Sequence, residues 1–487
     1  MRITNSITGK KEEFIPIKPN EVKMYACGIT VYDLSHIGHA RQAIVYAMIT
    51  DYLRYRGFNV TYVRNYTDVD DKIIRRANEL GKDAIEFSKE QIMETEKDMS
   101  DLHVTDADIK TKASEYIPKI IKFVQNLIDK GYAYVAENGD VYYQVRKFNG
   151  YGKLSHRNVD DMLNGVRIEL EEGKKDPLDF ALWKSAKPGE VYWESPWGKG
   201  RPGWHIECSA MALDTLGETI DIHGGGRDLL FPHHENEIAQ SESLTGKEFA
   251  HYWSHCGLIK INGEKMSKSL GNSLTIRDAL KMYNYEVIKY LMFSKHYVSD
   301  IDIHDEDFKI SEKHIYYFYT TIKEVEDYIE KNSNPQNSEI IDDETTSTII
   351  SKFIENMDDD FNSVAAIANL HNVFKYMNNL MKTAKKGNKE IASNTLKKML
   401  KDIKEVYSIL GLFEQNPNNF IDEIKNKYIK KLGLNIQEIE EKIVQRLEAK
   451  KSKDFEKADK IREELDGKGI ILNDSVDGTT WDLKELY

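Results

Sequence analysis

A strand, a helix and a second strand follow one another near the start of the chain. Residues 24–32 are apolar and rich in β-forming side chains, and they end in turn residues. From Ser35 the apolar residues recur at helical spacing as far as Gly57, and the alternation typical of a strand begins at Phe58. Such a βαβ unit joins parallel strands and places ligand sites at the strand ends. The sequence therefore predicts an α/β fold with a doubly wound, Rossmann-type parallel sheet.

A second α/β segment follows after a long interruption. From about residue 80 to residue 215 the pattern is mainly helical with short β-like pieces, so we interpret this stretch as an insertion that splits the sheet domain. The elements predicted after it are a strand over residues 219–223, a tight turn over residues 224–226, a helix that begins at Pro232, a strand over residues 252–261, and a helix capped by Thr275 with Asp278. The sheet is thus expected to resume after the insertion.

The chain of 487 residues is long enough for about three domains. After Tyr297 helices dominate and the β signal is weak. We predict a sheet domain over residues 1–310, a helical bundle over residues 311–418, and a small terminal domain over residues 419–487 that combines helices with a β-like tail.

The net charge of −13 does not favour nucleic-acid binding, but the charge is unevenly distributed. Residues 324–360 hold 12 acidic and 2 basic side chains, whereas residues 382–404 hold 8 lysines and 2 acidic side chains. Such blocks are commonly solvated helix faces, and the basic block is alternatively part of an RNA-facing surface. The pattern leaves both interpretations open.

The three cysteines are too few for a disulfide framework in a chain of this length, which favours the reducing cytosol. The longest apolar run, residues 44–49, is far shorter than the roughly 20 residues of a membrane-spanning helix. We therefore expect a cytoplasmic protein without a signal peptide or a membrane anchor.

The tetrapeptide His36-Ile37-Gly38-His39 stands where the first predicted strand gives way to the helix. Side chains three residues apart share a helix face, and the backbone N–H groups of a helix start favour an anion. Gly38 would let a flat ligand approach the backbone closely. This placement indicates a phosphate site, although two nearby histidines alone are more often incidental.

The segment Lys265-Met266-Ser267-Lys268-Ser269 follows the Asn-Gly turn. Two flexible ammonium groups with hydroxyls between them suit a site that neutralises a polyphosphate leaving group. Taken alone, it is an ordinary surface loop. The combination of the two motifs, one on each half of a split sheet, strengthens the interpretation.

Four further side chains are candidate metal ligands: Cys27, Cys208, His233 and Glu237. His233 and Glu237 are four residues apart and would share one face of a helix. A thiolate, imidazole and carboxylate set is typical of zinc. Because these residues are far apart in the sequence and lack Cys-x-x-Cys spacing, their spacing alone supports the site only weakly.

The two short motifs resemble the HIGH and KMSKS signatures of the class I aminoacyl-tRNA synthetases, and both are unaltered here. The resemblance narrows to the cysteinyl-tRNA synthetases through residues 25–32, 65–72, 203–209 and 231–237. Segments that resemble this family also occur at residues 357–362 and 478–481, so the resemblance covers nearly the whole chain.

The resemblance implies a set of site residues. The family's zinc ligands fall on Cys27, Cys208, His233 and Glu237, with His234 as the nearest competitor for the histidine position. ATP would be bound by Gly28, His36, Gly38, His39, Lys265 and Lys268, of which the two histidines and the two lysines would be catalytic. The amino-acid pocket would be lined by Thr67, Trp204, His223 and Asp228, for which ordinary packing is the alternative. Cys256 is surplus and is expected to be a small buried residue.

The resemblance also implies the reaction. L-Cysteine would be activated with ATP, accompanied by Mg²⁺, and passed from the adenylate to tRNA(Cys), with one Zn²⁺ per chain selecting the thiol. A monomer is favoured because no long heptad seam is visible. Trp481 would either stack on an anticodon base or pack against the preceding helices.

Two rival functions share parts of this sequence pattern. One is a paralogous cysteine ligase with an amino-sugar acceptor, which the long region after Tyr297 disfavours. The other is a non-catalytic protein that binds zinc and RNA, which the intact histidine and lysine motifs disfavour.

Overall fold

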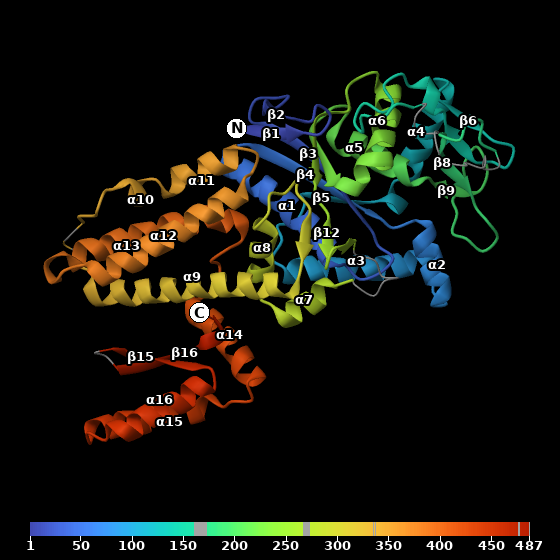
Figure 1. Ribbon diagram of the computed structural model, residues 1–487. Coiled ribbons are helices and arrows are strands. Elements are labelled where there is room, and N and C mark those ends of the chain that lie inside the picture. The colour runs from blue at the N-terminus through green and yellow to red at the C-terminus, as the bar shows by residue number, and fades with distance from the viewer. Residues whose placement is uncertain (160–172, 266–272, 335, 337, 476–477, 487) are drawn as a thin grey trace. The chain divides into compact units, whose positions relative to one another are not determined.

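A five-stranded parallel sheet organises the first part of the chain in the computed structural model, which describes residues 1–159, 173–265, 273–334, 336, 338–475 and 478–486 (Figure 1). The strand order is β11-β10-β3-β4-β5, and every neighbouring pair is parallel. The strands are β3 Glu21–Thr30, β4 Asn59–Thr67, β5 Ile109–Lys112, β10 Ile220–Gly226 and β11 Ala250–Cys256. The order reverses between β3 and β10, which is where doubly wound sheets bind their ligands. The predicted fold class is confirmed.

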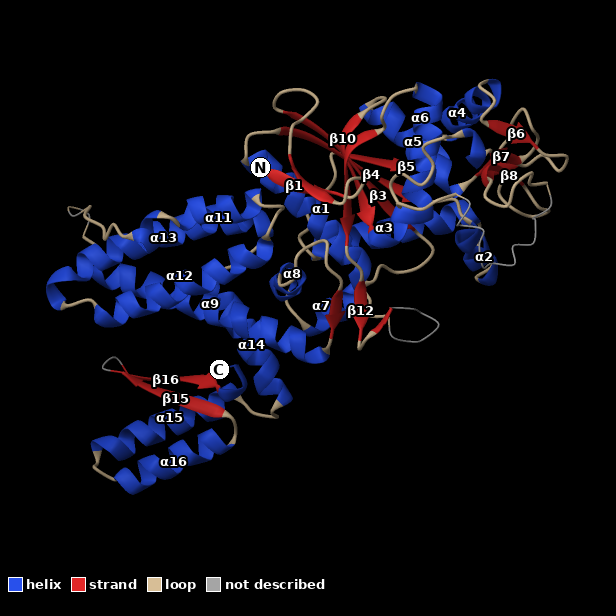
Figure 2. Cartoon of the chain, turned by 45° about the horizontal axis from the view of Figure 1, so that its top comes forward, coloured by secondary structure: helices blue, strands red, loops and turns tan. Residues whose placement is uncertain are grey.

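The predicted βαβ unit consists of β3, helix α1 (Ile37–Tyr55) and β4. β3 is buried along most of its length, as expected for a central parallel strand that is covered on both faces. Figures 1 and 2 show α1 and α3 on one side of the sheet and α4, α5 and α6 on the other. These helices are α3 Ala84–Asp101, α4 Ile117–Asp129, α5 Trp204–Leu216 and α6 Glu235–Thr245.

The insertion forms an antiparallel sheet in the order β6-β7-β8-β9. Its strands are β6 Ala133–Val135, β7 Val141–Tyr143, β8 Phe180–Ser185 and β9 Gly200–Pro202. β5 lies inside the stretch that we interpreted as an insertion, yet it is an edge strand of the parallel sheet. Four residues are too few to show a clear alternation in the sequence, so periodicity could not assign β5 to the main sheet.

Smaller elements complete the first unit, which comprises Met1–Tyr285, Met292–His304 and Ile354–Ala366. They are the hairpin β1 Arg2–Asn5 and β2 Lys10–Glu13, the helices α2 Asp71–Glu79 and α7 Ile276–Met282, and the strands β12 Ile259–Ile261, β13 Glu264–Lys265 and β14 Ile301–Ile303. The last three strands form a separate sheet in the order β13-β12-β14. Helix α8 Tyr285–Phe293 contributes only its two ends to this unit, because Glu286–Leu291 belong to the second unit. Thr275 caps α7 as predicted, because its side chain accepts the backbone N–H of Asp278.

The tight turn predicted at residues 224–226 is wrong. All three glycines are strand residues at the end of β10, where they pair with residues 254–256 of β11. A Cβ atom on Gly224 would lie 2.4 Å from the Tyr46 hydroxyl oxygen, and the Gly225 N–H donates to that hydroxyl at 2.6 Å. The glycines therefore let the Tyr46 side chain of α1 approach the backbone of β10 closely. This close contact requires glycine whether or not the chain turns here.

Two further element boundaries differ from the prediction. The helix expected at Pro232 begins at Glu235, after a π-helical turn over Leu230–His234, because Phe231 before the proline is extended (φ −141°, ψ 131°). The single strand predicted over residues 252–261 is two strands, β11 and β12, which belong to different sheets. The chain changes sheet at Gly257, where a Cβ atom would lie 2.2 Å from the Ser299 carbonyl oxygen.

The second unit comprises Glu286–Leu291, Asp305–Phe353 and Ile367–Tyr487 and is mainly helical. The helices from α9 onward, including the parts of α11 and α12 that belong to the first unit, are α9 Asp305–Asn332, α10 Glu344–Ser347, α11 Ile349–Asp358, α12 Ser363–Thr383, α13 Lys389–Tyr407, α14 Pro417–Lys431, α15 Ile436–Lys451 and α16 Phe455–Gly467. The hairpin β15 Ile470–Ser475 and β16 Gly478–Leu483 follows α16, and a short 3₁₀ helix, Lys484–Leu486, comes after it. Within the described residues, no helix is both long and apolar enough to cross a membrane.

Trp481 packs within this unit. Its indole N–H donates to Glu440 at 2.6 Å, and the Lys425 ammonium lies 4.5 Å from the ring centroid. These contacts agree with the packing alternative for Trp481, whereas stacking on a base is not tested by them. The division into three domains also stays a prediction.

Candidate functional site

A cavity of about 300 Å³ lies where the order of the parallel sheet reverses. Most of the residues that line it come from the ends of β3, β4, β10 and β11 and from the first turns of α1 and α5, and others come from α2, β12 and the turn before α6. Among them are Cys27, Gly28, His36, Gly38, His39, Gln42, Asn65, Thr67, Lys72, Trp204, Cys208, Asp228, His233 and Cys256. The cavity therefore joins the histidine motif to three of the four candidate metal ligands.

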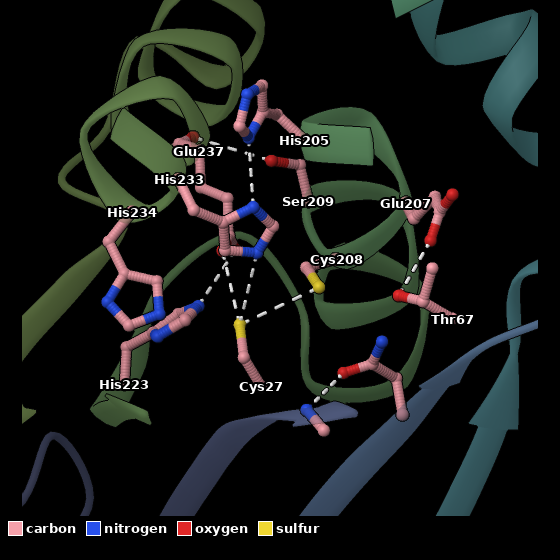
Figure 3. Close-up of polar contacts among 12 residues, drawn as sticks. Cys27, Thr67, His205, Glu207, Cys208, Ser209, His223, His233, His234 and Glu237 are labelled. Carbon is pink, nitrogen blue, oxygen red and sulfur yellow. Dashed lines mark hydrogen bonds and ion pairs between the residues drawn. The ribbon is translucent and has the colours of Figure 1, made fainter. Parts of the chain in front are cut away.

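The structure brings Cys27, Cys208, His233 and Glu237 together (Figure 3). Their ligand atoms all lie within 4.8 Å of one another. The Cys27 sulfur is 3.6 Å from the Cys208 sulfur, 3.5 Å from His233 Nε2 and 3.3 Å from Glu237 Oε1. All four side chains are at most 2% exposed. Since buried charges are normally paired or coordinate a metal, this group could hold a cation.

The pKa shifts of the side chains in this group indicate that the group lacks positive charge. Burial raises the pKa of the Cys27 thiol well above its usual range, and Cys208 and Glu237 add to this rise. Burial also opposes ionisation of Cys208, but its contacts with Cys27 and His233 outweigh burial and lower its pKa to about 6. Burial disfavours the charged form of His233, yet Glu237 and Cys208 raise its pKa to about 10. A divalent cation would supply the missing charge and hold both sulfurs as thiolates.

Each of the two ligands from the α6 region is oriented by a second side chain. His223 Nε2 lies 2.9 Å from Glu237 Oε2, and His205 Nδ1 lies 2.9 Å from His233 Nδ1. Such outer contacts fix the orientation of metal ligands. The rings of Trp204 and His233 also stack, with centroids 4.4 Å apart.

His234, the competitor for the histidine position, belongs to a different group. It lies with His223 and Cys27 in a second buried set of possible ligands. Its Nδ1 is 2.8 Å from His255 Nε2, and His255 in turn contacts the Ser6 hydroxyl at 2.7 Å. Burial lowers the pKa of His234 well below its usual range, and the neighbouring histidines lower it further. His233 is the histidine that meets both cysteines and Glu237.

Gly28 also lines the cavity and directly follows Cys27 of the metal-type group, which we define as Cys27, Cys208, His233 and Glu237. The Gly28 N–H donates to the Asn65 side-chain oxygen at 2.8 Å, and a Cβ atom at this position would lie only 1.6 Å from the Asn65 carbonyl oxygen. Any side chain would therefore force β3 and β4 apart. β3 pairs irregularly with β4 between Ala26 and Ile29, which is where this close approach occurs.

The histidine motif begins helix α1. His36 is the N-cap, and its Nδ1 accepts the Gly38 N–H at 3.1 Å, while the His36 N–H donates to His39 Nδ1 at 3.3 Å. The two rings stack with centroids 3.7 Å apart. Because both Nδ1 atoms accept backbone protons, each neutral ring carries its own proton on Nε2. The arrangement adds two N–H donors to a helix start that already favours an anion.

The lysine motif is only partly described. Lys265 ends β13, whereas Lys268 lies outside the described residues. The chain after the motif returns to the start of α1, since the Ile37 N–H donates to the Leu274 carbonyl and the Ile276 N–H donates to the Ser35 carbonyl, each at 3.0 Å. The described residues that follow the lysine motif, 274–276, are thus hydrogen-bonded to the start of α1.

Of the four residues expected in the amino-acid pocket, three line the cavity and one does not. Thr67, Trp204 and Asp228 line the cavity. His223 is fully buried behind Glu237 and is not among the lining residues. Thr67 donates to the buried Glu207 carboxyl group at 3.0 Å. The roles of these residues stay predictions, and Cys256 is buried as expected, at 1% exposure.

Sequence reasoning missed several residues of the site. Asn65 fixes the Gly28 backbone, and Gln42 on α1 donates to the Cys27 carbonyl at 2.5 Å. His205 supports His233, and Lys72 lines the cavity. Three of these residues lie within or beside the family-like segments, but only the fold shows what they contact.

Two family models match the chain. The model described as tRNA synthetases class I (C) catalytic domain matches residues 13–313, and the model described as DALR domain matches residues 352–414. The cysteine–tRNA ligase of Thermodesulfovibrio yellowstonii is 49% identical over 99% of this chain and 100% of the relative. The cysteine–tRNA ligase of Geobacter metallireducens is 47% identical over 99% of this chain and 100% of the relative.

Solved structures show the same fold at low identity. Mycobacterium tuberculosis methionyl-tRNA synthetase in complex with methionyl-adenylate aligns with a TM-score of 0.62 and 13% identity, covering 86% of this chain and 94% of that one. The leucyl-tRNA synthetase of Agrobacterium radiobacter, in a ternary complex with tRNA, aligns with a TM-score of 0.58 and 10% identity, covering 83% and 87% of the two chains. From the match of the catalytic-domain model and the full-length identity to its relatives, the chain belongs to the cysteinyl-tRNA synthetases of class I.

Proposed function

We propose that this cavity activates L-cysteine with ATP and that the chain, as a cysteine–tRNA ligase, then transfers the cysteinyl group to tRNA(Cys). One observation carries the proposal: a buried group of two thiols, an imidazole and a carboxylate shares a cavity with a helix start capped by two histidines. The first element suits a thiol-selecting metal and the second suits a phosphate.

The donor set fits Zn²⁺, which prefers sulfur and nitrogen ligands and accepts carboxylate. Cys27, Cys208, His233 and Glu237 would hold the ion, and His205 and His223 would orient two of these ligands. Zinc in this position would favour the thiolate of the substrate over the hydroxyl of serine, which is a weaker acid and a harder ligand. An apolar pocket alone would separate the two amino acids by only about 10²-fold.

The activation step needs no covalent enzyme intermediate. A carboxylate oxygen of cysteine attacks the α-phosphorus of ATP as the bond from that phosphorus to the oxygen that bridges it to the β-phosphorus breaks, so that cysteinyl-adenylate forms and pyrophosphate leaves. The Nε2 protons of His36 and His39 and the free N–H groups at the start of α1 would stabilise the charge on the phosphate oxygens. Gly28 and Gly38 would let the nucleotide approach the backbone.

The lysines of the KMSKS motif would neutralise the leaving pyrophosphate. Lys268 is assigned the closest contact and Lys265 the second. The remaining reaction is attack by a ribose hydroxyl at the end of the tRNA on the cysteinyl carbonyl, with AMP as the leaving group. Thr67, Trp204 and Asp228 would position the amino acid for both steps, and His223 would act through Glu237.

Selection by the metal has a consequence for specificity. We expect serine-dependent pyrophosphate exchange to be undetectable with the zinc-replete protein, and no editing site is required. Readily measured exchange with serine would contradict selection by zinc. X-ray absorption at the zinc edge provides a direct check, because added cysteine should introduce one more sulfur neighbour.

The full-length match to cysteine–tRNA ligases favours a tRNA acceptor over an amino sugar. The DALR match and the terminal helices α14 to α16 provide the candidate tRNA-binding region. We further propose a cytoplasmic monomer, in keeping with three free cysteines.

The test is charging of bulk tRNA with labelled cysteine by the purified, zinc-replete protein. The control is tRNA whose terminal ribose has been oxidised with periodate. Charging that is lost on oxidation supports the proposal. Cysteine-dependent pyrophosphate exchange without charging would indicate the small-molecule ligase, and the absence of both activities would indicate a binding protein.

A further inference from the structure

We propose that Arg41 is a positioning residue that fixes the strands leading into the KMSKS segment against the helix carrying His36 and His39. This proposal rests on the proposed function, because it concerns how the two phosphate-binding motifs are held together. Arg41 lies on α1 two residues after His39, and it is 1% exposed.

The Arg41 guanidinium donates to backbone carbonyls from two separate segments. Nη1 donates to the Leu258 carbonyl at 3.0 Å, and Nη2 donates to the carbonyls of Tyr297, at 3.3 Å, and Ser299. Nη2 also lies 3.4 Å from the His296 carbonyl oxygen. Among the described residues no carboxylate forms an ion pair with Arg41, so its partners are these carbonyl dipoles. The five N–H donors of an arginine suit this purpose, whereas a lysine could reach only part of the set.

The two segments lead directly into β12 and β14 of the small sheet, whose third strand, β13, ends at the first lysine of the motif. Leu258 lies between β11 and β12, and residues 296–299 precede β14. β12 pairs with both β14 and β13, and β13 ends at Lys265. The segments also contact each other closely, since the Gly257 N–H donates to the Tyr297 carbonyl at 2.8 Å. Arg41 therefore holds α1 against the residues that lead into the strands before the KMSKS segment.

The other end of the same segment is held differently. After the lysine motif, two backbone hydrogen bonds join Ser35 and Ile37 to Ile276 and Leu274. The return of the segment to α1 thus depends on main-chain groups that any sequence supplies. On the departure side, Arg41 supplies the hydrogen bonds that join α1 to these two segments within the described residues, so a single substitution can loosen that link.

The kinetic consequence is specific to the nucleotide. Without the Arg41 contacts, β12 and β13 could shift relative to α1, and a misplacement of about 1 Å can lower a rate by roughly 10²-fold. We expect Arg41→Lys to lower kcat of cysteine-dependent pyrophosphate exchange at least about tenfold and to raise KM for ATP. KM for cysteine should stay within about twofold, because the metal-type group is built on β3, α5 and the α6 region.

The experiment measures both KM values, kcat, zinc content and local hydrogen exchange of the full chain. Arg54→Lys is the matched control, because Arg54 lies on the same helix but forms an exposed ion pair with Asp108 at 2.7 Å. In Arg41→Lys, exchange should rise in peptides covering residues 257–265 and 294–301 and stay unchanged in peptides covering residues 205–240. Zinc content should equal that of the unsubstituted protein.

Three results would overturn the proposal: kcat and KM for ATP unchanged within twofold, an equal rise of both KM values, or faster exchange throughout the first unit. If Arg41→Lys does not fold, Gly257→Ala disturbs the same junction, since its Cβ would meet the Ser299 carbonyl oxygen at 2.2 Å, and it should produce the same kinetic pattern. Failure of the proposed function is distinguishable, because the unsubstituted protein would then lack cysteine-dependent exchange while the hydrogen-exchange result still tests the position of Arg41.

Discussion

The metal-type group and the histidine pair lie in one cavity, yet the chain assembles them in different ways. The four candidate ligands come from β3, α5 and the region of α6, and Cys27 is 181 residues from Cys208. The two histidines come from four consecutive residues, and the backbone of one helix start holds both rings. The four candidate ligands are at most 2% exposed, whereas His36 and His39 are only partly buried.

This difference agrees with what each end of the cavity is proposed to recognise. A thiol differs from a hydroxyl by one atom, so its recognition needs rigid, desolvated ligands that only a complete fold can bring together. A phosphate chain is large and strongly charged, and a helix start with a few N–H donors is sufficient for it. Substitutions at the metal-type group should therefore affect binding and metal content, while substitutions at the phosphate end should affect the rate.

The largest effect is expected for Cys208→Ser. Because a thiolate ligand is replaced by a poor one, zinc content should fall well below one ion per chain and kcat/KM for cysteine should fall at least about 100-fold. Elemental analysis and pyrophosphate exchange measure the two quantities. Cys256→Ser is the matched control, because Cys256 is equally buried but lies outside the metal-type group, and it should retain its zinc. Loss of zinc from both variants would remove the distinction between these cysteines.

A narrower effect, confined to the rate and without loss of zinc, is expected for Lys268→Ala. Loss of one charge that stabilises the leaving group should slow adenylate formation by about 10² to 10³-fold, while cysteine affinity and zinc content stay unchanged. Single-turnover kinetics measure this rate. Lys281→Ala removes an exposed lysine of α7 and should leave the rate unaltered. An unchanged rate in Lys268→Ala would remove the role assigned to this lysine.

The parts of the fold that produce a periodic pattern of apolar residues could be predicted from the sequence. The βαβ unit of β3, α1 and β4 follows from alternating and helical spacing, and the cap at Thr275 follows from local side-chain chemistry. The glycines at residues 224–226 were misplaced because glycine serves both a turn and a close approach. Only the contact with Tyr46 shows which of the two applies.

The candidate site was predictable to the extent that its residues form motifs or match a family. The place of the histidine pair at a predicted helix start indicated a phosphate site, although two nearby histidines alone are more often incidental. Spacing gave little support to the metal-type group, which depended on resemblance. Asn65 and Arg41 could not be found, because their partners are backbone groups. For Arg41 one of these partners is 258 residues away in the sequence. Every residue type has a backbone carbonyl, so the sequence gives no sign of which one Arg41 contacts.

The smallest effect in this series concerns His36, which has two roles that can be separated. Its Nδ1 caps α1, and its Nε2 proton is proposed to face the phosphates. His36→Ala removes both roles, whereas His36→Asn retains a cap, since asparagine is among the best N-cap residues. We expect both variants to slow adenylate formation by about tenfold, but only His36→Ala to lose about 1 kcal/mol of unfolding free energy in urea. If His36→Asn kept the full rate, His36 would be a structural cap alone, and the phosphate end of the cavity would depend on His39 and the lysines.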